Sequence, residues 1–451
     1  MIRKEIHEIV NRSAKEFEQI SDQVWEFAET CFEENQSSAL QSAYLEKRGF
    51  RVKTGVSNMP TAFIAEWGSG SPVIAILGEN DALASLSQEA DLAVCTPITA
   101  GAPGHGCGHN LLGTGGMEAA CAVKEYLEAN KLAGTIRYYG TPAEEGGGGK
   151  VYMVLDHQFD DVDACFVWHP SSSWDVTTKG LAIVSAYFKF EGIASHAAAA
   201  DQGRSALDAL ELMNVGVNFL REHVRAGTLM HYSITNTGGP AANIVQQNAE
   251  GFYILRNESQ AYLKELFARV EDVARGAALM TGTKFVGSQI ISNYANINPN
   301  SVLDEVVLQN LKEILPLEYT EEEKAYGQQF VDIGTKKDVK TPYKSEATHG
   351  EAIICSDVCD VSWVTPLSHF FGVTLAQGTL GHSWMTVSQG KSSTAKKGMH
   401  AAAEVMANSA IDVIENPELI KKAKEAFKES LENNPPYETL MVNCDPKDYR
   451  Q

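Results

Sequence analysis

The sequence predicts an α/β fold, in which a mostly parallel sheet with helices on both faces is interrupted by a smaller inserted domain. Strand-like and helical segments alternate as far as about residue 180, and this alternation is typical of a parallel sheet. Near residue 181 the order of the elements changes, and near residue 298 the first pattern returns. We therefore expect one domain from residues 1–180 and 298–451, and an inserted domain from residues 181–297.

The first part of the chain alternates strands, polar loops and helices. Polar residues follow two of the strands directly: Glu144-Glu145 after one and His169 after the other. Because sites in such sheets form beyond the carboxyl ends of the strands, we expect these side chains to lie close together. The long loop 86–106 is also expected to be functional. The predicted elements are helices over the first thirty residues, 37–48 and 150–156, and strands 62–67, 73–77, 135–140 and 164–168.

The inserted region has a different order of elements. It reads β-α-β-β-α-β, which is the self-contained ferredoxin-like unit of two helices on a four-stranded sheet. Its predicted strands are 184–191, 228–235, 250–256 and 284–292, and its helices are 203–223 and 259–280. After it we expect a helix over 301–315, a polar acidic stretch over 321–344, strands over 359–364 and 373–376, and a long helix from residue 394.

Composition restricts the possible partners. The 451 residues carry a net charge of −21, and no basic cluster is present to bind nucleic acid or an anionic membrane. A negatively charged substrate would therefore need individual, locally placed cations. The eight cysteines are scattered and do not form a disulfide framework, and the N-terminus lacks a signal-peptide core. These features predict a soluble, cytoplasmic protein.

A Cys and a His two residues apart suggest a metal site. Cys107 and His109 are separated by Gly108 just before a predicted helix, and thiolate sulfur and imidazole nitrogen both bind zinc-like ions. Alone, such a pair is more often an inert buried thiol and a helix-capping imidazole than a metal site. Further ligand-type residues change this interpretation, because Glu144-Glu145, His169 and His382 all follow segments that are expected to end at one edge of the sheet.

Each of these residues also has an ordinary structural interpretation. Glu144-Glu145 could be a solvated helix N-terminus, where acidic groups favour the dipole, and His169 and His382 could be core histidines. The tandem of glutamates allows one carboxylate to bind a metal while its neighbour takes a proton from water. Because four segments carry such residues, a shared metal centre is favoured over four unrelated structural roles.

Five motifs stand out along the chain: Cys107-Gly-His109-Asn110, Pro142-Ala-Glu144-Glu145-Gly-Gly, Trp168-His169-Pro170, Ala194-Ser-His196-Ala-Ala and Gly381-His382-Ser383. They resemble those of the amidohydrolase branch of the aminoacylase/carboxypeptidase metallopeptidase superfamily, and the similarity runs nearly end to end. The resemblance implies a metallohydrolase catalytic domain with two divalent ions, zinc or manganese, and an inserted lid that dimerises.

The resemblance also implies a role for each candidate residue. Glu144 would be the general base, and His196 would stabilise the oxyanion in the partner's site. Asn243 and Arg256 would hold the carboxylate of the substrate, and Arg256 meets the need for a local cation. The implied metal ligands are Cys107, His109, Glu145, His169 and His382.

The activity implied by the resemblance is metal-dependent hydrolysis of the amide bond of an N-acyl amino acid, with p-aminobenzoyl-glutamate as the first substrate to test. The partner would be a second copy of the chain or a homologous subunit. Alternatives are a broader aminoacylase, a dipeptidase or aromatic-acyl amino acid hydrolase, and a non-catalytic metal-binding regulatory protein. The pocket departs from the family pattern, because Asn110 is followed by Leu111 rather than leading to a further His, and Trp384 replaces the usual Pro after His382-Ser383.

Overall fold

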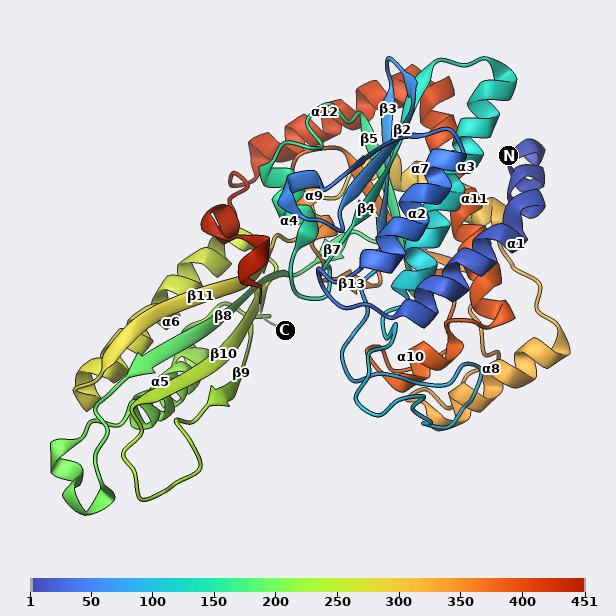
Figure 1. Cartoon of the computed structure of the whole chain (residues 1–451). Helices are drawn as coiled ribbons and strands as arrows, with labels where there is room; N and C mark the ends of the chain where they lie inside the picture. The colour runs from blue at the N-terminus through green and yellow to red at the C-terminus, as the bar shows by residue number, and fades with distance from the viewer. Residues whose placement is uncertain (1–2, 450–451) are drawn as a thin grey trace.

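The computed structural model describes residues 3–449, and it has two bodies of unequal size (Figure 1). The larger is an α/β domain built on an eight-stranded sheet, and the smaller is an elongated antiparallel-sheet domain that projects from one side. This arrangement confirms the predicted fold class. Among the described residues, no helix is long and apolar enough to cross a membrane.

The main sheet has the strand order β1-β2-β4-β3-β5-β14-β6-β12. Its centre is parallel, since β3 pairs in parallel with β4 and β5, and β14 pairs in parallel with β5. The carboxyl ends of these central strands therefore lie at one edge of the sheet. The strands are β1 (Arg51–Thr54), β2 (Phe63–Ser69), β3 (Val73–Glu79), β4 (Gly134–Thr141), β5 (Ala164–Ser171), β6 (Trp174–Val176), β12 (Ala347–His349) and β14 (Leu367–Val373).

Helices cover both faces of this sheet. The helices of this domain are α1 (Lys4–Phe27), α2 (Asn35–Lys47), α3 (His109–Asn130), α4 (Gly149–Leu155), α7 (Ser301–Ile314), α8 (Glu321–Ile333), α9 (Val358–Val361), α10 (Trp384–Gln389), α11 (Ser393–Glu415) and α12 (Pro417–Asn433). Of these, α8 and α10 lie beyond the end of the sheet (Figure 1). Along β3, Ile74 and Ile76 belong to the core beneath α3 and α11, whereas Ala75 and Leu77 belong to the core beneath α4 and α9. Successive side chains of β3 therefore point to opposite faces of the sheet, and both faces are buried.

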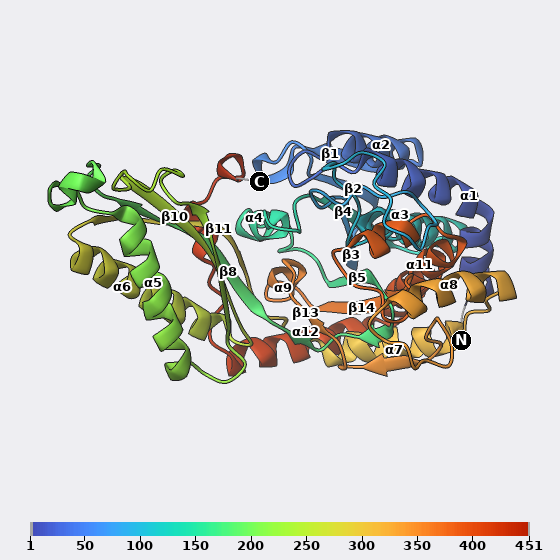
Figure 2. The same cartoon turned by 90° about the horizontal axis from the view of Figure 1, so that it is seen from below.

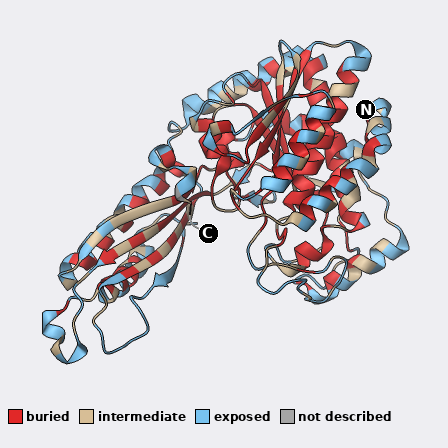
Figure 3. Ribbon diagram, viewed as in Figure 1, coloured by how far each residue is buried: buried red, intermediate tan, exposed pale blue. Residues whose placement is uncertain are grey.

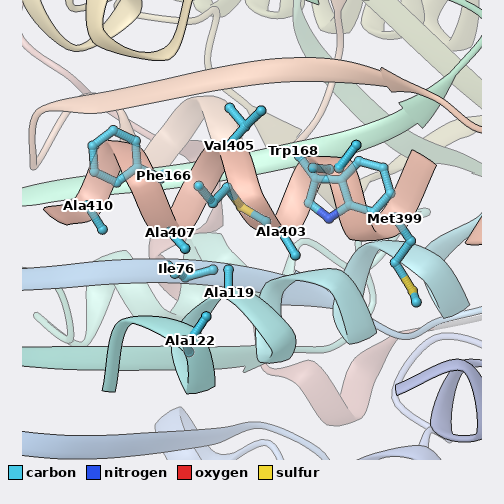
Figure 4. Close-up of a cluster of buried hydrophobic side chains, with 14 of the residues drawn as sticks. Ile76, Ala119, Ala122, Phe166, Trp168, Met399, Ala403, Val405, Ala407 and Ala410 are labelled. Atoms are coloured by element: carbon cyan, nitrogen blue, oxygen red, sulfur yellow. The ribbon is translucent and has the colours of Figure 1, made fainter. Parts of the chain in front are cut away.

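Small residues let α3 and α11 approach the sheet and each other closely. Figure 4 shows alanines of both helices, among them Ala119 and Ala403, next to Ile76, Phe166 and Trp168. These side chains are completely or almost completely buried. The resulting core fixes the start of α3, and with it His109, against the ends of the central strands.

The smaller domain has its own core and the predicted β-α-β-β-α-β order. Its elements are β8 (Ala182–Glu191), α5 (Ala206–Leu220), β9 (Leu229–Asn236), β10 (Asn248–Asn257), α6 (Gln260–Thr281) and β11 (Lys284–Tyr294). The sheet is antiparallel with the order β11-β8-β10-β9, and α5 and α6 pack on one face of it (Figure 2). We propose residues 181–297 as the limits of this domain, which we call the lid.

The structure corrects the sequence prediction in the C-terminal part of the main domain. The segment predicted as a strand over 359–364 contains α9 instead, because Val358 and Val361 are spaced to pack on one side of a helical turn. The next strand, β14, ends at Val373 rather than beginning there, since it pairs with β5 from Leu367 onward. The acidic stretch contains α8, which begins with a capping box in which Thr320 and Glu323 satisfy each other's backbone amides.

Several elements were not predicted. These are α12, which follows α11 directly, and the short strands β1, β6, β12, β7 (Lys179–Gly180) and β13 (Ile353–Ile354). The short strands have four residues or fewer, too few for periodicity to identify them.

Candidate metal centre

The ends of the central strands bring the candidate ligands together. Glu79 ends β3, Glu144 and Glu145 follow β4, and His169 lies near the carboxyl end of β5. The other candidates come from the start of α3 and from the loop before α10. Three groups of donor atoms lie within 4.8 Å of one another: Cys107, His109 and His169; Cys107, Glu145 and His382; and Glu79, His109 and Glu144.

All five predicted metal ligands belong to the two groups that contain Cys107. The Cys107 Sγ lies 3.3 Å from the His169 Nε2, and the His382 Nε2 lies 3.4 Å from the Glu145 Oε2. His109 and Glu144, the predicted base, also meet in the third group, where the His109 Nε2 is 4.0 Å from the Glu144 Oε2. A thiolate, imidazoles and carboxylates at this spacing form a donor set suited to zinc-like ions.

The hydrogen bonds of two histidines leave their Nε2 atoms free for a metal. The His109 Nδ1 lies 3.0 Å from both the backbone oxygen and Oδ1 of Asp81, and the His169 Nδ1 lies 2.8 Å from the carbonyl oxygen of Pro170. Each Nδ1 must therefore carry the proton, so that each Nε2 presents a lone pair. Histidines that bind metals are typically held in this way. The His109 Nε2 is buried and has no hydrogen-bond partner.

Backbone conformation at Gly108 brings Cys107 and His109 into place. Gly108 has φ +80° and precedes the first turn of α3. A Cβ at this position would lie 2.9 Å from the Cβ of Pro170, directly after His169. Only glycine combines this left-handed conformation with so close an approach of the two ligand segments.

Two further carboxylates hold the loop that carries the glutamate pair. The Asp81 Oδ2 accepts a hydrogen bond of 2.9 Å from the Glu145 backbone N–H. The Glu34 Oε1 accepts one of 2.9 Å from the backbone N–H of Ala143, which has φ +60°. Burial, together with the charge of Asp81, raises the pKa of Glu34 to about 8. The turn before Glu144 is thus fixed by side chains from two other segments of the chain.

The carboxylates of the site are too crowded to be ionised together without cations. Burial and the charges of Glu79 and Glu145 raise the pKa of Glu144 well above its usual value. Burial raises the pKa of Glu145 to about 7, with Asp81 contributing. The Glu145 Oε1 is also buried without a hydrogen-bond partner. Divalent ions would offset this repulsion, so the donor set fits the group that the motifs imply.

The three predicted lid residues occupy opposite ends of the lid. Arg256 is near the carboxyl end of β10, opposite Ile183, and its guanidinium lies against the thiol of Cys355. Its charge, after the larger effects of burial and His109, contributes to a lowered pKa of His382. Arg256 therefore lies at the end of the lid that adjoins the main domain.

His196 and Asn243 lie at the other end. The Ala197 N–H donates to the carbonyl oxygen of Asn243 at 2.9 Å, so the two segments are adjacent. Both side chains are exposed. Asn248 and Arg256 are eight residues apart on β10, which corresponds to roughly 26 Å in an extended strand. Figure 1 shows the segment after β8 at the tip of the lid, far from the main sheet. One chain does not bring these two residues to Arg256.

Sequence reasoning gave no role to four charged residues at this site: Glu79, Asp81, Lys150 and Asp357. Glu79 and Asp81 lie in the polar run at the carboxyl end of β3, a position that could have been used to find them. Lys150 and Asp357 are completely buried, and the Lys150 Nζ lies 2.7 Å from the Asp357 Oδ1. No local pattern identifies this pair, which is 207 residues apart in the chain.

The fold and site together define a metal-dependent amidohydrolase with an α/β catalytic domain and an antiparallel lid. The model of peptidase family M20/M25/M40 matches residues 76–445, and the chain belongs to this family.

Two relatives align with this chain over nearly their whole length. The chain is 38% identical to a subunit of the p-aminobenzoyl-glutamate hydrolase of Escherichia coli, over 98% of both chains. It is 28% identical to the Xaa-Arg dipeptidase of Mus musculus, over 95% of this chain and 92% of the relative.

Solved structures have the same fold at low sequence identity. An aminobenzoyl-glutamate utilization protein from Klebsiella pneumoniae superposes with a TM-score of 0.65 at 17% identity, covering 90% of this chain and 98% of that one. A dinuclear metal binding peptidase of the M20 family from Bacillus subtilis gives a TM-score of 0.62 at 15% identity, covering 90% and 99%.

Proposed function

We propose that the protein hydrolyses the amide bond of an N-acyl amino acid, and that p-aminobenzoyl-glutamate is the first substrate to test. The observation that carries the proposal is the pair of histidines, His109 and His169, whose Nε2 lone pairs point toward Cys107 and the carboxylates. The name of the 38% identical relative supports the choice of substrate.

Five residues would hold two divalent ions, zinc or manganese. Cys107 belongs to both ligand groups, so its thiolate would serve both ions; His109 and His169 complete one group, and Glu145 and His382 complete the other. When bound, such ions supply the Lewis acidity that polarises an amide carbonyl and makes water acidic near neutral pH.

Glu144 is the proposed general base. Its carboxylate takes the proton of the attacking water and then delivers it to the nitrogen of the departing amine, so that water and amide become an acid and an amine. Its backbone is held from two sides: the Tyr294 hydroxyl donates to the Glu144 carbonyl oxygen at 2.9 Å, and Glu34 holds the preceding residue. Glu145, whose Oε2 lies near His382, has the separate role of ligand.

Arg256 of the same chain would bind the carboxylate of the substrate. A guanidinium binds a carboxylate through two parallel hydrogen bonds, and the Arg256 Nε is buried without a hydrogen-bond partner. A protein of net charge −21 attracts an anion only through such a local cation.

His196 and Asn243 would serve the site of a partner subunit. The His196 Nδ1 accepts a hydrogen bond of 3.0 Å from the Ala198 N–H, so the neutral ring carries its proton on Nε2. That outward-facing N–H is suited to stabilise an oxyanion, and the exposed Asn243 amide is suited to the substrate carboxylate. The distance to the cluster in the same chain supports a contribution across a dimer.

The lid also offers a surface for such a dimer. Strand β9 is the outer strand of its sheet, and Leu229, Tyr232 and Ile234 on it are 43%, 39% and 41% exposed. An outer strand with exposed apolar side chains is well suited to pair with another chain. The partner would be a second copy or a homologous subunit, and the latter is supported by the Escherichia coli relative, whose name makes it one subunit of a hydrolase. The eight free cysteines are in keeping with a cytoplasmic location.

Metal analysis combined with a substrate screen tests the proposal. We expect up to two zinc or manganese ions per chain, and hydrolysis of p-aminobenzoyl-glutamate that stops after chelation and returns when metal is restored. Cys107→Ala and His109→Ala should lose metal, whereas Cys121→Ala, which removes a buried thiol from the middle of α3, should not. Full metal retention by both ligand variants would place the metal elsewhere.

A dipeptide with a basic C-terminal residue is the second candidate substrate. The net charge of −21 favours a cationic side chain over an anionic one at long range, and one relative is an Xaa-Arg dipeptidase. The screen should therefore compare p-aminobenzoyl-glutamate with dipeptides that end in Arg or Lys. A larger kcat/KM for the dipeptides would make them, rather than p-aminobenzoyl-glutamate, the proposed substrates.

A further inference from the structure

A buried group of three charges lies directly beneath the candidate metal centre. Lys150, Glu79 and Asp357 are all 0–1% exposed. The Lys150 Nζ lies 2.6 Å from the Glu79 Oε1 and 2.7 Å from the Asp357 Oδ1. Lys150 comes from α4, and Asp357 precedes α9; Figure 2 shows these two helices side by side, between the main sheet and the lid.

Stability alone does not explain such a group. Removing three charges from water costs several kcal/mol per ion, and apolar residues of the same volume often stabilise a core equally well. The geometry of Glu79 indicates another use, because its two oxygens face different neighbours. One oxygen, Oε1, is taken by Lys150, and the other, Oε2, lies 3.2 Å from the His109 Nε2.

The contact between Glu79 and His109 has the spacing of two ligands on one ion. Neither the Glu79 Oε2 nor the His109 Nε2 has a hydrogen-bond partner, although both are buried. Two donors that are each about 2.0–2.1 Å from the same zinc ion, at angles of about 90–110°, lie roughly 2.8–3.4 Å apart. The observed 3.2 Å falls in this range.

We infer that Glu79 is a further metal ligand, and that Lys150 acts as a positioning residue that leaves only one of its oxygens free for the ion. The inference rests on the proposed function, because Glu79 shares the ligand His109 with the group of Cys107, His109 and His169.

The ammonium group of Lys150 holds one oxygen of Glu79 in place. Its Nζ lies 2.6 Å from the Glu79 Oε1, so the Oε2 is the oxygen left for a cation. Asp357 in turn accepts from both the Nζ and the backbone N–H of Lys150, at 2.7 and 2.9 Å. The ammonium group is therefore fixed from two directions.

The test measures metal content and metal spectra. We expect the parent protein to keep two zinc ions after dialysis, and Glu79→Gln to keep one, with affinity for the other reduced by roughly a hundredfold or more. Lys150→Met keeps the donor oxygen, so it should keep both ions and lose only about tenfold in affinity, as is typical when a residue behind a ligand is removed. With cobalt in place of zinc, Glu79→Gln should retain the thiolate-to-metal band of Cys107 and change the d–d bands.

Controls separate this inference from its alternatives. Glu118→Gln changes an equally buried glutamate on α3 that is paired with His400, and it should keep both ions and the parental cobalt spectrum. If Glu79→Gln does not fold, the double variant Glu79→Gln/Lys150→Met removes both charges, and it too should keep one ion.

The inference is overturned if Glu79→Gln or the double variant binds two ions with parental affinity and spectrum, which would leave the three charges as a structural ion group. Full metal retention by Cys107→Ala and His109→Ala is a different result. It would overturn the proposed metal centre itself, and Glu79 as a ligand with it.

Discussion

The catalytic domain and the lid hold their proposed functional residues in opposite ways. In the catalytic domain, His109, Glu144 and Glu79 are buried and fixed by neighbouring side chains. In the lid, His196 and Asn243 are exposed at the tip, where most of the surface is accessible (Figure 3). Groups that are shielded from water bind metal ions and protons strongly. Exposed groups make strong electrostatic interactions only when another surface covers them and excludes water. Under the proposed function, one chain would build the metal centre, and a partner would complete the substrate site.

The largest effect should come from the buried base. We expect Glu144→Gln to keep the fold and the metal but to lower kcat by roughly a hundred- to ten-thousandfold, the usual contribution of a positioned acid–base group. Steady-state kinetics and metal analysis measure the two properties separately. Glu145→Gln is the matched control, since this variant should lose metal instead. Parental activity in Glu144→Gln would show that proton transfer depends on another residue.

Arg256 should have the next largest effect, because it is the lid residue that faces the catalytic domain of its own chain. Arg256→Ala should lower kcat/KM for an N-acyl amino acid by roughly ten- to two-hundredfold, because charge-assisted bonds contribute about 1.5–3 kcal/mol. Arg256→Lys should recover part of this loss, and Arg275→Ala, an exposed cation on α6, should cause none.

The same substrate with its α-carboxylate blocked tests the cause of this loss. It should be hydrolysed poorly by the parent and by Arg256→Ala alike. If both enzymes hydrolyse the blocked substrate as fast as the free acid, Arg256 does not bind the carboxylate.

Mixing two inactive variants tests whether the tip of the lid serves a partner. His196→Ala and Glu144→Gln subunits should each be inactive alone. After subunit exchange, about a quarter of the parental activity should return, since half of the dimers are mixed and each has one intact site. His223→Ala, which changes another exposed lid histidine, should be active without mixing. Absence of recovery despite demonstrated exchange would argue that His196 acts within its own chain.

The smallest expected effect is a change in local stability after the metal is removed, and it can be measured without a substrate. Chelation should increase hydrogen exchange in the ligand segments 104–110 and 143–149, which lose their bound ions, and should leave 182–294 nearly unchanged. Mass spectrometry of deuterium uptake, with and without chelator, measures both regions in one sample. Equal changes in the two regions would show that the lid and the metal centre unfold together.

Much of this molecule is determined by short segments of sequence. The alternation of strands and helices predicts a parallel sheet, and the β-α-β-β-α-β order predicts the lid, because each depends only on periodicity over neighbouring residues. The same is true of Cys107-Gly108-His109, which lies at the start of a helix, and of Glu144-Glu145, which follows a strand. The segment 359–364 forms the end of α9 and a turn instead of a strand, because packing of Val358 and Val361 overrides local β preference.

Tertiary structure alone decided which distant residues meet. Lys150 contacts Glu79 and Asp357, which are 71 and 207 residues away in the chain, and no local pattern records such pairs. It also decided which predicted partners stay apart: β10 places Arg256 and Asn243 near opposite ends of the lid, although only thirteen residues separate them in sequence. The physical reason is that an extended strand separates residues that are close in sequence, whereas the packed core joins residues that are far apart in it.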